Sequence, residues 1–228
     1  MKVFAISDLH LSGSQNKPMD VFGEKWKDYT NTITENWNKC VSDGDVVVIA
    51  GDISWAMRLE DAKADLDWID GLPGIKIILR GNHDYWWSSL TRVRSAAGRI
   101  HVVQNDAHKI GDYIFCGSRG WLLPGTKGFK ADDAKIYTRE LLRLKLSLDA
   151  AKRLQNNNEK IIVAMHFPPL DSVPDKGYEE LFVQYGIDTV IYGHIHGARV
   201  DTPIREINGI KYYITSCDLL NFDPLEIV

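Results

Sequence analysis

Side chains of the types that bind metals follow five short apolar runs of this chain. Each run is long enough for a strand, and each is followed, directly or after one glycine, by Asp, His or Asn. In chain order the polar residues are Asp8, His10, Asp52, Asn82, His83, Asp84, His166, His194 and His196. Carboxylate, imidazole and carboxamide groups together suit divalent transition ions such as Mn, Fe or Zn, while thiolates are absent. The residue types therefore predict metal chemistry.

The spacing of these residues supports the same prediction. Asp8 and His10 are two residues apart, and so are His194 and His196. In an extended segment, side chains at this spacing point to the same side. Glycine directly precedes three of the candidate ligands, which relieves crowding where backbone and ion approach closely. Each short motif alone arises easily by chance, but the full ordered set is much more specific.

The elements that must position these residues are expected to be strands of an α/β fold. The apolar runs lie at residues 2–7, 46–50, 75–80, 161–165 and 189–192. They are mostly apolar without alternation, as in strands that are buried on both faces. In open α/β sheets, ligands bind at the carboxyl ends of strands, where the loops converge. The five strand ends therefore predict a single site.

Between these strands, apolar residues at a spacing of three and four predict helices. The first helix is marked by Phe22, Trp26, Tyr29, Ile33 and Trp37. A second is expected over about residues 59–69, and a third from about 132 to 154. We interpret their apolar stripes as core.

Further short strands predict that the sheets are mixed. Residues 102–104, 109–110 and 113–116 are expected to form short antiparallel strands around turns. Residues 202–207 and 211–215 flank Asn208-Gly209, a strong hairpin signal. Because there is no internal repeat or linker, we expect one domain over residues 1–228.

Composition narrows the class of protein. The chain has 228 residues, enough for one substantial core, with 27 Lys and Arg against 31 Asp and Glu and a net charge of -4. No long run of charge is present, which disfavours an extended nucleic-acid surface or an anionic-membrane surface. The three cysteines are isolated, which indicates neither a disulfide framework nor a thiolate zinc site. Without a signal-peptide core or a membrane span, we expect a soluble cytoplasmic enzyme.

The ordered motifs resemble those of the calcineurin-like metallophosphoesterases. The signature of that family is D-x-H, G-D, G-N-H-[D/E], H and G-H-x-H, and every element is present between Asp8 and His196. The resemblance implies a four-layer α/β/β/α sandwich with two mixed central β-sheets. It also implies two divalent metal ions per chain at the rim of the sandwich.

The resemblance assigns a role to each motif residue. One ion would be held by Asp8, His10, Asp52 and His196, and the other by Asp52, Asn82, His166 and His194, with Asp52 bridging. His83 matches the family's histidine on the leaving-group side, and Asp84 matches the carboxylate that orients it. The implied reaction is in-line attack of a metal-bridging hydroxide on a phosphomonoester or phosphodiester. The implied partner is a small phosphorylated substrate.

The second motif departs from one branch of that family. Protein Ser/Thr phosphatases carry an Asp-Arg pair shortly after the bridging Asp, where this chain has Trp55 and Ala56. The absence of that phosphate-gripping arginine weakens a protein-phosphatase assignment. Arg58, Arg80 and Arg119 are candidates for a phosphate contact, and the sequence leaves open whether any of them reaches the substrate. We interpret the tryptophans near the motifs as packing residues rather than stacking platforms.

Three alternatives remain open at this point. One is a nucleotide pyrophosphatase or nuclease of the same fold, which a comparison of diester and monoester substrates would separate. Another is a non-catalytic, metal-bound scaffold, against which stands the full set of ligands together with His83. The third is an unrelated mononuclear protein, which would leave seven ligands at strand ends unexplained.

Overall fold

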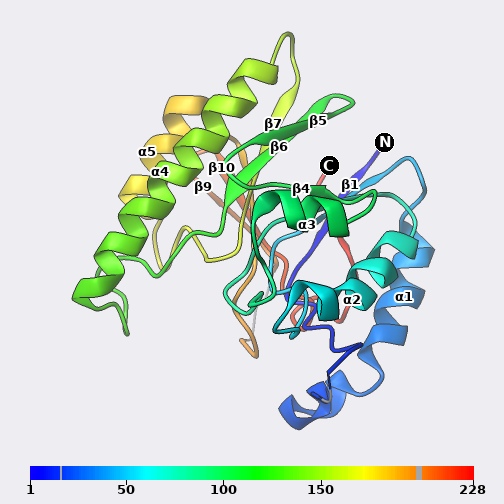
Figure 1. The fold of residues 1–228 in the computed structure, drawn as a ribbon. Coiled ribbons are helices and arrows are strands. Elements are labelled where there is room, and N and C mark those ends of the chain that lie inside the picture. The colour runs from blue at the N-terminus through cyan, green and yellow to red at the C-terminus, as the bar shows by residue number, and fades with distance from the viewer. Residues whose placement is uncertain (16, 199–201) are drawn as a thin grey trace.

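The computed structural model of this chain describes residues 1–15, 17–198 and 202–228. Two β-sheets lie face to face in the centre, and helices cover both outer faces (Figure 1). One outer layer consists of α1 (Tyr29–Cys40), α2 (Leu59–Gly71) and α3 (Leu90–Ala96). The other consists of α4 (Ala131–Leu154) and α5 (Lys176–Tyr185). This arrangement confirms the expected α/β/β/α sandwich.

The central strands of each sheet are parallel, and the first sheet has one antiparallel edge strand whereas the second has two. The first sheet has the order β11-β1-β2-β3-β4, comprising Leu225–Glu226, Val3–Ile6, Val46–Ile49, Ile75–Ile78 and His101–Val102, and only β11 is antiparallel to its neighbour. The second has the order β5-β6-β7-β8-β10-β9, comprising Ala107–Ile110, Tyr113–Ser118, Lys160–Met165, Thr189–Tyr192, Ile210–Ile214 and Ile204–Ile207. Here β5 and β9 are the antiparallel edge strands. The prediction of mixed sheets is confirmed.

The apolar runs are continuous because both faces of the strands are covered. In β1, Val3 and Ala5 point between the two sheets, whereas Phe4 and Ile6 pack under the helices of the first outer layer. All four side chains are at most 2% exposed. Neither face of this strand tolerates a polar residue until the strand ends, so the first polar side chains appear at the rim.

The first predicted helix is wrong over its first two turns. Met19–Phe22 and Glu24–Trp26 form two 3₁₀ helices, η1 and η2, and α1 begins only at Tyr29. Gly23 between η1 and η2 has a φ of 130°, and Asp28 before α1 has a φ of 54°. A right-handed helix excludes both conformations, so the apolar spacing continues through a segment whose backbone is not α-helical.

The short strands between residues 101 and 118 pair differently from the prediction. The strand β4 lies parallel to β3 at the edge of the first sheet, whereas the sequence predicts antiparallel pairing with its neighbours along the chain. The hairpins β5–β6 and β9–β10 are antiparallel as predicted, with Asn208 and Gly209 at the second turn in left-handed conformations.

Among the described residues, no helix combines the length and the apolarity that a membrane crossing requires.

Candidate metal centre

The predicted ligands come together at the carboxyl ends of five parallel strands, β1, β2, β3, β7 and β8. Two groups of donor atoms result. One consists of Asp8, His10 and His196, and the other of Asp52, His166 and His194; within each group the donor atoms lie within 4.8 Å of one another. Both sheets contribute to each group, so the site lies across the rim of the sandwich.

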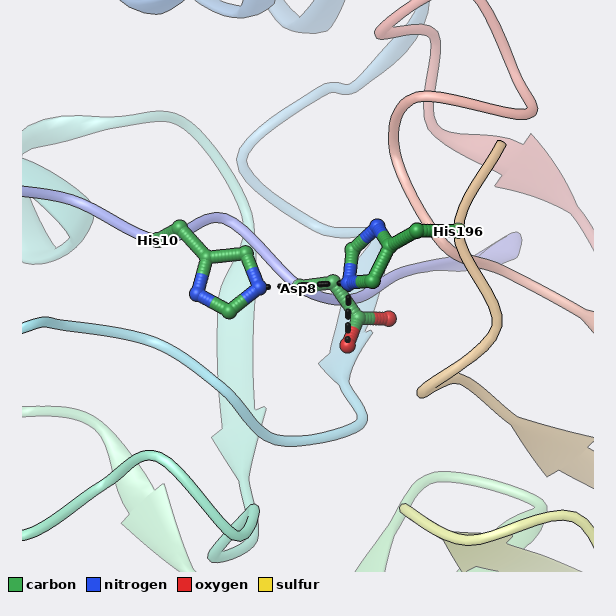
Figure 2. A group of neighbouring side chains, drawn as sticks. All are labelled: Asp8, His10 and His196. Carbon is green, nitrogen blue, oxygen red and sulfur yellow. Dashed lines mark hydrogen bonds and ion pairs between the residues drawn. The ribbon is translucent and has the colours of Figure 1, made fainter. Parts of the chain in front are cut away.

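The first group faces one small space (Figure 2). The Nε2 atoms of His10 and His196 are 3.2 Å apart, and His196 Nε2 lies 3.6 Å from Asp8 Oδ1. Asp8 and His10 are buried, so neither can turn toward bulk water. Two imidazole nitrogens that converge with a carboxylate form a donor set that a divalent transition ion fits.

The second group is centred on His166. Its Nε2 lies 2.7 Å from Asn82 Oδ1, 3.3 Å from His194 Nδ1 and 3.4 Å from Asp52 Oδ2. Asp52 Oδ2 also lies 3.9 Å from His10 Nε2, in the first group. The Asp52 carboxylate therefore stands between the two groups, as a bridging ligand would.

The backbone at these ligands is unusual. Asp8, His10, Asp52 and His194 all have a positive φ, between 47° and 73°. Left-handed conformations cost a non-glycine residue about 1–2 kcal/mol, and they persist where the surrounding structure imposes them. A side chain at Gly81 would overlap the Asp52 carboxylate, which explains why the third motif begins with glycine.

The electrostatics leave His10 and His194 neutral but favour a proton on His166. Burial lowers the pKa of His10 to about 3 and that of His194 to about 4, so both rings are neutral at pH 7. Burial opposes the charge on His166, but the Asp52 and Asp8 carboxylates outweigh it and raise the pKa of His166 to about 9. A metal ion at the second group would displace that proton, so ion binding there is coupled to proton release.

His83 lines the same cleft without joining either donor group. The cleft has a volume of about 490 Å³, and Asp52, His10, His194 and His196 also border it. The His83 ring is half-buried and lies 4.8 Å from the Trp55 ring, and its main-chain N–H donates to Asp52 Oδ1 at 2.8 Å. Burial lowers the pKa of the His83 imidazole.

Asp84 does not orient His83, contrary to what the resemblance implies. Its Oδ1 accepts from the main-chain N–H groups of Ile53 and Ser54 and from the Trp86 indole. Its Oδ2 accepts from the main-chain N–H groups of Asp52 and Gly81 at 3.0 and 2.7 Å. The ring of His83 instead contacts Tyr85 OH, at 3.4 Å. Asp84 is fully buried and joins the loop after β2 to the loop after β3.

The structure adds one residue that the motifs do not include. Asp218, after β10, accepts from His196 Nδ1 at 2.9 Å, from Gly197 N at 3.0 Å and from Lys25 Nζ at 3.0 Å. A carboxylate on Nδ1 fixes the imidazole orientation and leaves Nε2 free toward the ion. Asp218 belongs to no motif, and no sequence signal places it near His196.

The three arginines considered as phosphate contacts lie outside the cleft. Arg58 is exposed and directly precedes α2. Arg80 and Arg119 line a separate small pocket together with Glu140 and Arg143 from α4. Within the part of the chain that the structure describes, no arginine lines the cleft at the metal ligands.

The tryptophans are mainly packing residues, as interpreted from the sequence. Trp86 and Trp87 are buried, and their indole N–H groups donate to Asp84 and Gln104. Trp55, in contrast, borders the cleft, and its ring stacks on His10 with the centroids 4.6 Å apart.

Solved structures with low sequence identity share this fold. One is the Thermus thermophilus protein TT1561, with a TM-score of 0.63 and 12% identity over 98% of this chain and 96% of that chain. Another is phosphopantetheinyl hydrolase from Mycobacterium tuberculosis, with a TM-score of 0.52 and 14% identity over 97% of this chain and 91% of the other.

Curated relatives align with part of the chain. An uncharacterized protein of Methanocaldococcus jannaschii is 32% identical over 109 residues, 46% of this chain and 58% of that protein. The gene 66 protein of Mycobacterium phage L5 is 29% identical over 104 residues, 46% of this chain and 43% of that protein. The match thus spans about half the length of these relatives.

The family model of the calcineurin-like phosphoesterases matches residues 1–198. The chain therefore belongs to the calcineurin-like phosphoesterase family.

Proposed function

We propose that this chain is a dinuclear metal-dependent phosphoester hydrolase. The observation that carries this proposal is the position of Asp52, whose Oδ2 lies 3.9 Å from a nitrogen of the first donor group and 3.4 Å from a nitrogen of the second. A single site would need only three or four donors, whereas two groups with a carboxylate between them suit a pair of ions.

The proposed ligands of one ion are Asp8, His10, Asp52 and His196, and those of the other are Asp52, Asn82, His166 and His194. This oxygen and nitrogen donor set suits Mn, Fe or Zn. When bound, two such ions would supply Lewis acidity to the phosphoryl oxygens and acidify a water molecule.

The chain's own contribution to the reaction is assigned to His83. Its ring borders the cleft but ligates neither group, so it is available to the substrate. Because burial lowers its pKa, the ring is mostly neutral at pH 7 in the metal-free chain. We propose that a ring N–H of His83 donates to the leaving oxygen as negative charge develops there.

The proposed substrate is a small phosphomonoester or phosphodiester. The full donor set together with His83 supports catalysis over a non-catalytic scaffold. The position of Arg80 and Arg119 in a different pocket leaves the protein-phosphatase assignment without its phosphate-gripping arginine.

The test is a substrate panel on protein of defined metal content. The chain is stripped with a chelator, reloaded with Mn²⁺ and assayed with 4-nitrophenyl phosphate and bis(4-nitrophenyl) phosphate. We expect turnover of at least one ester, abolished by chelation and restored by Mn²⁺. Absence of turnover on monoesters and diesters with both ions bound would favour the scaffold alternative.

A further inference from the structure

Apolar side chains make up part of the cleft at the metal ligands. The apolar wall, as we call it, consists of Met19, Phe22, Trp26 and Trp55. Trp55 lies against His10 and His83, with ring centroids 4.6 and 4.8 Å away. The Trp26 ring lies 6.2 Å from that of His196. When the phosphate of a substrate lies at the metal ligands, its organic part therefore lies against this wall.

Three of the four wall residues come from the two 3₁₀ helices before α1, Met19 and Phe22 from η1 and Trp26 from η2, whereas Trp55 follows β2. Trp26 is 4% exposed and packs edge-on against Tyr29 and Phe222, with centroids 5.2 and 5.3 Å away. Phe22, in contrast, is 65% exposed although it lines the cleft. Trp26 thus anchors the segment, while Phe22 leaves an aromatic ring available to a ligand.

Phe22 is a better candidate than Trp55 for contact with a substrate. One face of the Trp55 ring stacks on His10, and Lys17 Nζ lies 3.6 Å from the ring centroid. The Trp55 indole N–H is directed to Met19 Sδ at 3.2 Å. The ring and the indole N–H of Trp55 therefore already contact other residues of the chain, which leaves less of this side chain for a substrate.

Among the described residues, two lysines lie at the cleft, Lys17 beside the Trp55 ring and Lys25 in the lining. Among the described lining residues the only Lys or Arg is Lys25, whose Nζ donates to Asp218 Oδ2 at 3.0 Å. That ion pair supports His196 through the same carboxylate. A second phosphate group would need further Arg or Lys donors, because each dianion is held by several charge-assisted hydrogen bonds. The described lining thus offers a second phosphate one lysine, which is already paired with Asp218.

We propose that the leaving group of the substrate is apolar, an aromatic ring or hydrocarbon chain on an ester with a single phosphate, and that Phe22 is a specificity-determining residue. This inference rests on the proposed phosphoester hydrolysis. His83, assigned to the leaving oxygen, lies beside Trp55, so the group that departs is the one next to the wall.

The experiment compares phenyl phosphate with 2-naphthyl phosphate on the Mn²⁺-loaded protein. The two leaving groups have similar acidity but differ by one fused ring, so a difference in kcat/KM reports apolar contact. We expect about tenfold higher kcat/KM for the naphthyl ester, and little turnover of inorganic pyrophosphate. Equal values for the two esters, or a preference for pyrophosphate, would overturn the proposal.

Substitutions test whether Phe22 causes the preference for the naphthyl ester. Phe22→Ala is expected to reduce the naphthyl-to-phenyl ratio at least threefold, mainly through KM, and Phe22→Leu to restore most of it. The matched control is Leu142→Ala, which removes an apolar side chain that is 60% exposed on α4 and should leave the ratio unchanged. An unchanged ratio in Phe22→Ala would exclude Phe22 as a specificity residue.

Binding separates this inference from the proposed function. Benzyl phosphonate and 2-naphthylmethyl phosphonate cannot be hydrolysed, and calorimetry gives their dissociation constants on the same protein. Tighter binding of the naphthyl compound, lost in Phe22→Ala, supports the apolar wall even where no ester is turned over. Equal dissociation constants refute the wall even where esters are hydrolysed.

Discussion

Replacement of Asp218 by Asn tests how a residue that contacts a metal ligand from behind supports the metal centre. The side chain is 1% exposed and accepts three hydrogen bonds, from His196, Gly197 and Lys25. Asn has nearly the same shape but no charge, so the His196 contact loses its charge assistance. A hydrogen bond to a charged group contributes about 1.5–3 kcal/mol, of which a neutral acceptor retains part. The Lys25 contact loses its charge assistance as well. Loss of a partner that orients a metal-binding histidine typically weakens ion binding 10–100-fold, which corresponds to about 1.4–2.7 kcal/mol.

Calorimetric titration of the metal-free protein with Mn²⁺ measures this change. We expect one of two binding events to weaken 10–100-fold in Asp218→Asn, and the event assigned to Asp52, Asn82, His166 and His194 to change little. Asp223→Asn is the control, since Asp223 is an exposed carboxylate five residues further along the chain. Affinities within twofold of wild type in Asp218→Asn would refute the role assigned to Asp218.

Four further predictions follow from named contacts. His83→Ala should retain the metal content of wild type but lose about 10²-fold or more in kcat, measured on a matched aryl phosphate. Asp52→Asn should lose bound metal as well as activity, as metal analysis of the dialysed protein would reveal. Leu148→Ala, at a fully buried position on α4, should lower the free energy of unfolding by about 2–5 kcal/mol in urea titrations. The hydrogen bond from Lys109 and those from main-chain N–H groups lower the pKa of Glu159 to about 2, below its value in the unfolded chain. The stability that Glu159 contributes is thus complete above about pH 5 and lost as the pH falls toward 2, so Glu159→Gln should lower the melting temperature at pH 7 but not at pH 2.

The buried strands and the ligand positions could be predicted from the sequence because one physical constraint determines both. A strand covered on both faces must be apolar throughout, so the first Asp or His marks its end, as Asp8 does after β1. Parallel strands place such ends at one rim. The ligand residues can therefore be identified from the sequence without knowing which strands are neighbours in the sheets.

Other features depend on contacts that residue type and spacing do not encode. The apolar spacing from Phe22 to Trp37 continues across η1 and η2, where Met19 and Trp26 pack against the core. Phe22 itself is exposed, so the interpretation of the whole stripe as core is wrong at this position. The motif pairs Asp84 with its neighbour His83, but main-chain N–H groups from the loop after β2 occupy the Asp84 oxygens instead. Asp218 is 22 residues from His196, and only the parallel pairing of β8 and β10 places it there.

The central claim is that the residues at this rim would hold two ions, which would support hydrolysis of a phosphoester by this chain. The most direct test is to titrate the metal-free chain with Mn²⁺ while measuring both the bound metal and the rate of aryl phosphate hydrolysis. The rate should rise with occupancy and reach its plateau at two ions per chain. Fewer than one bound ion per chain at saturation, or a plateau already reached at one, would contradict the two-metal account.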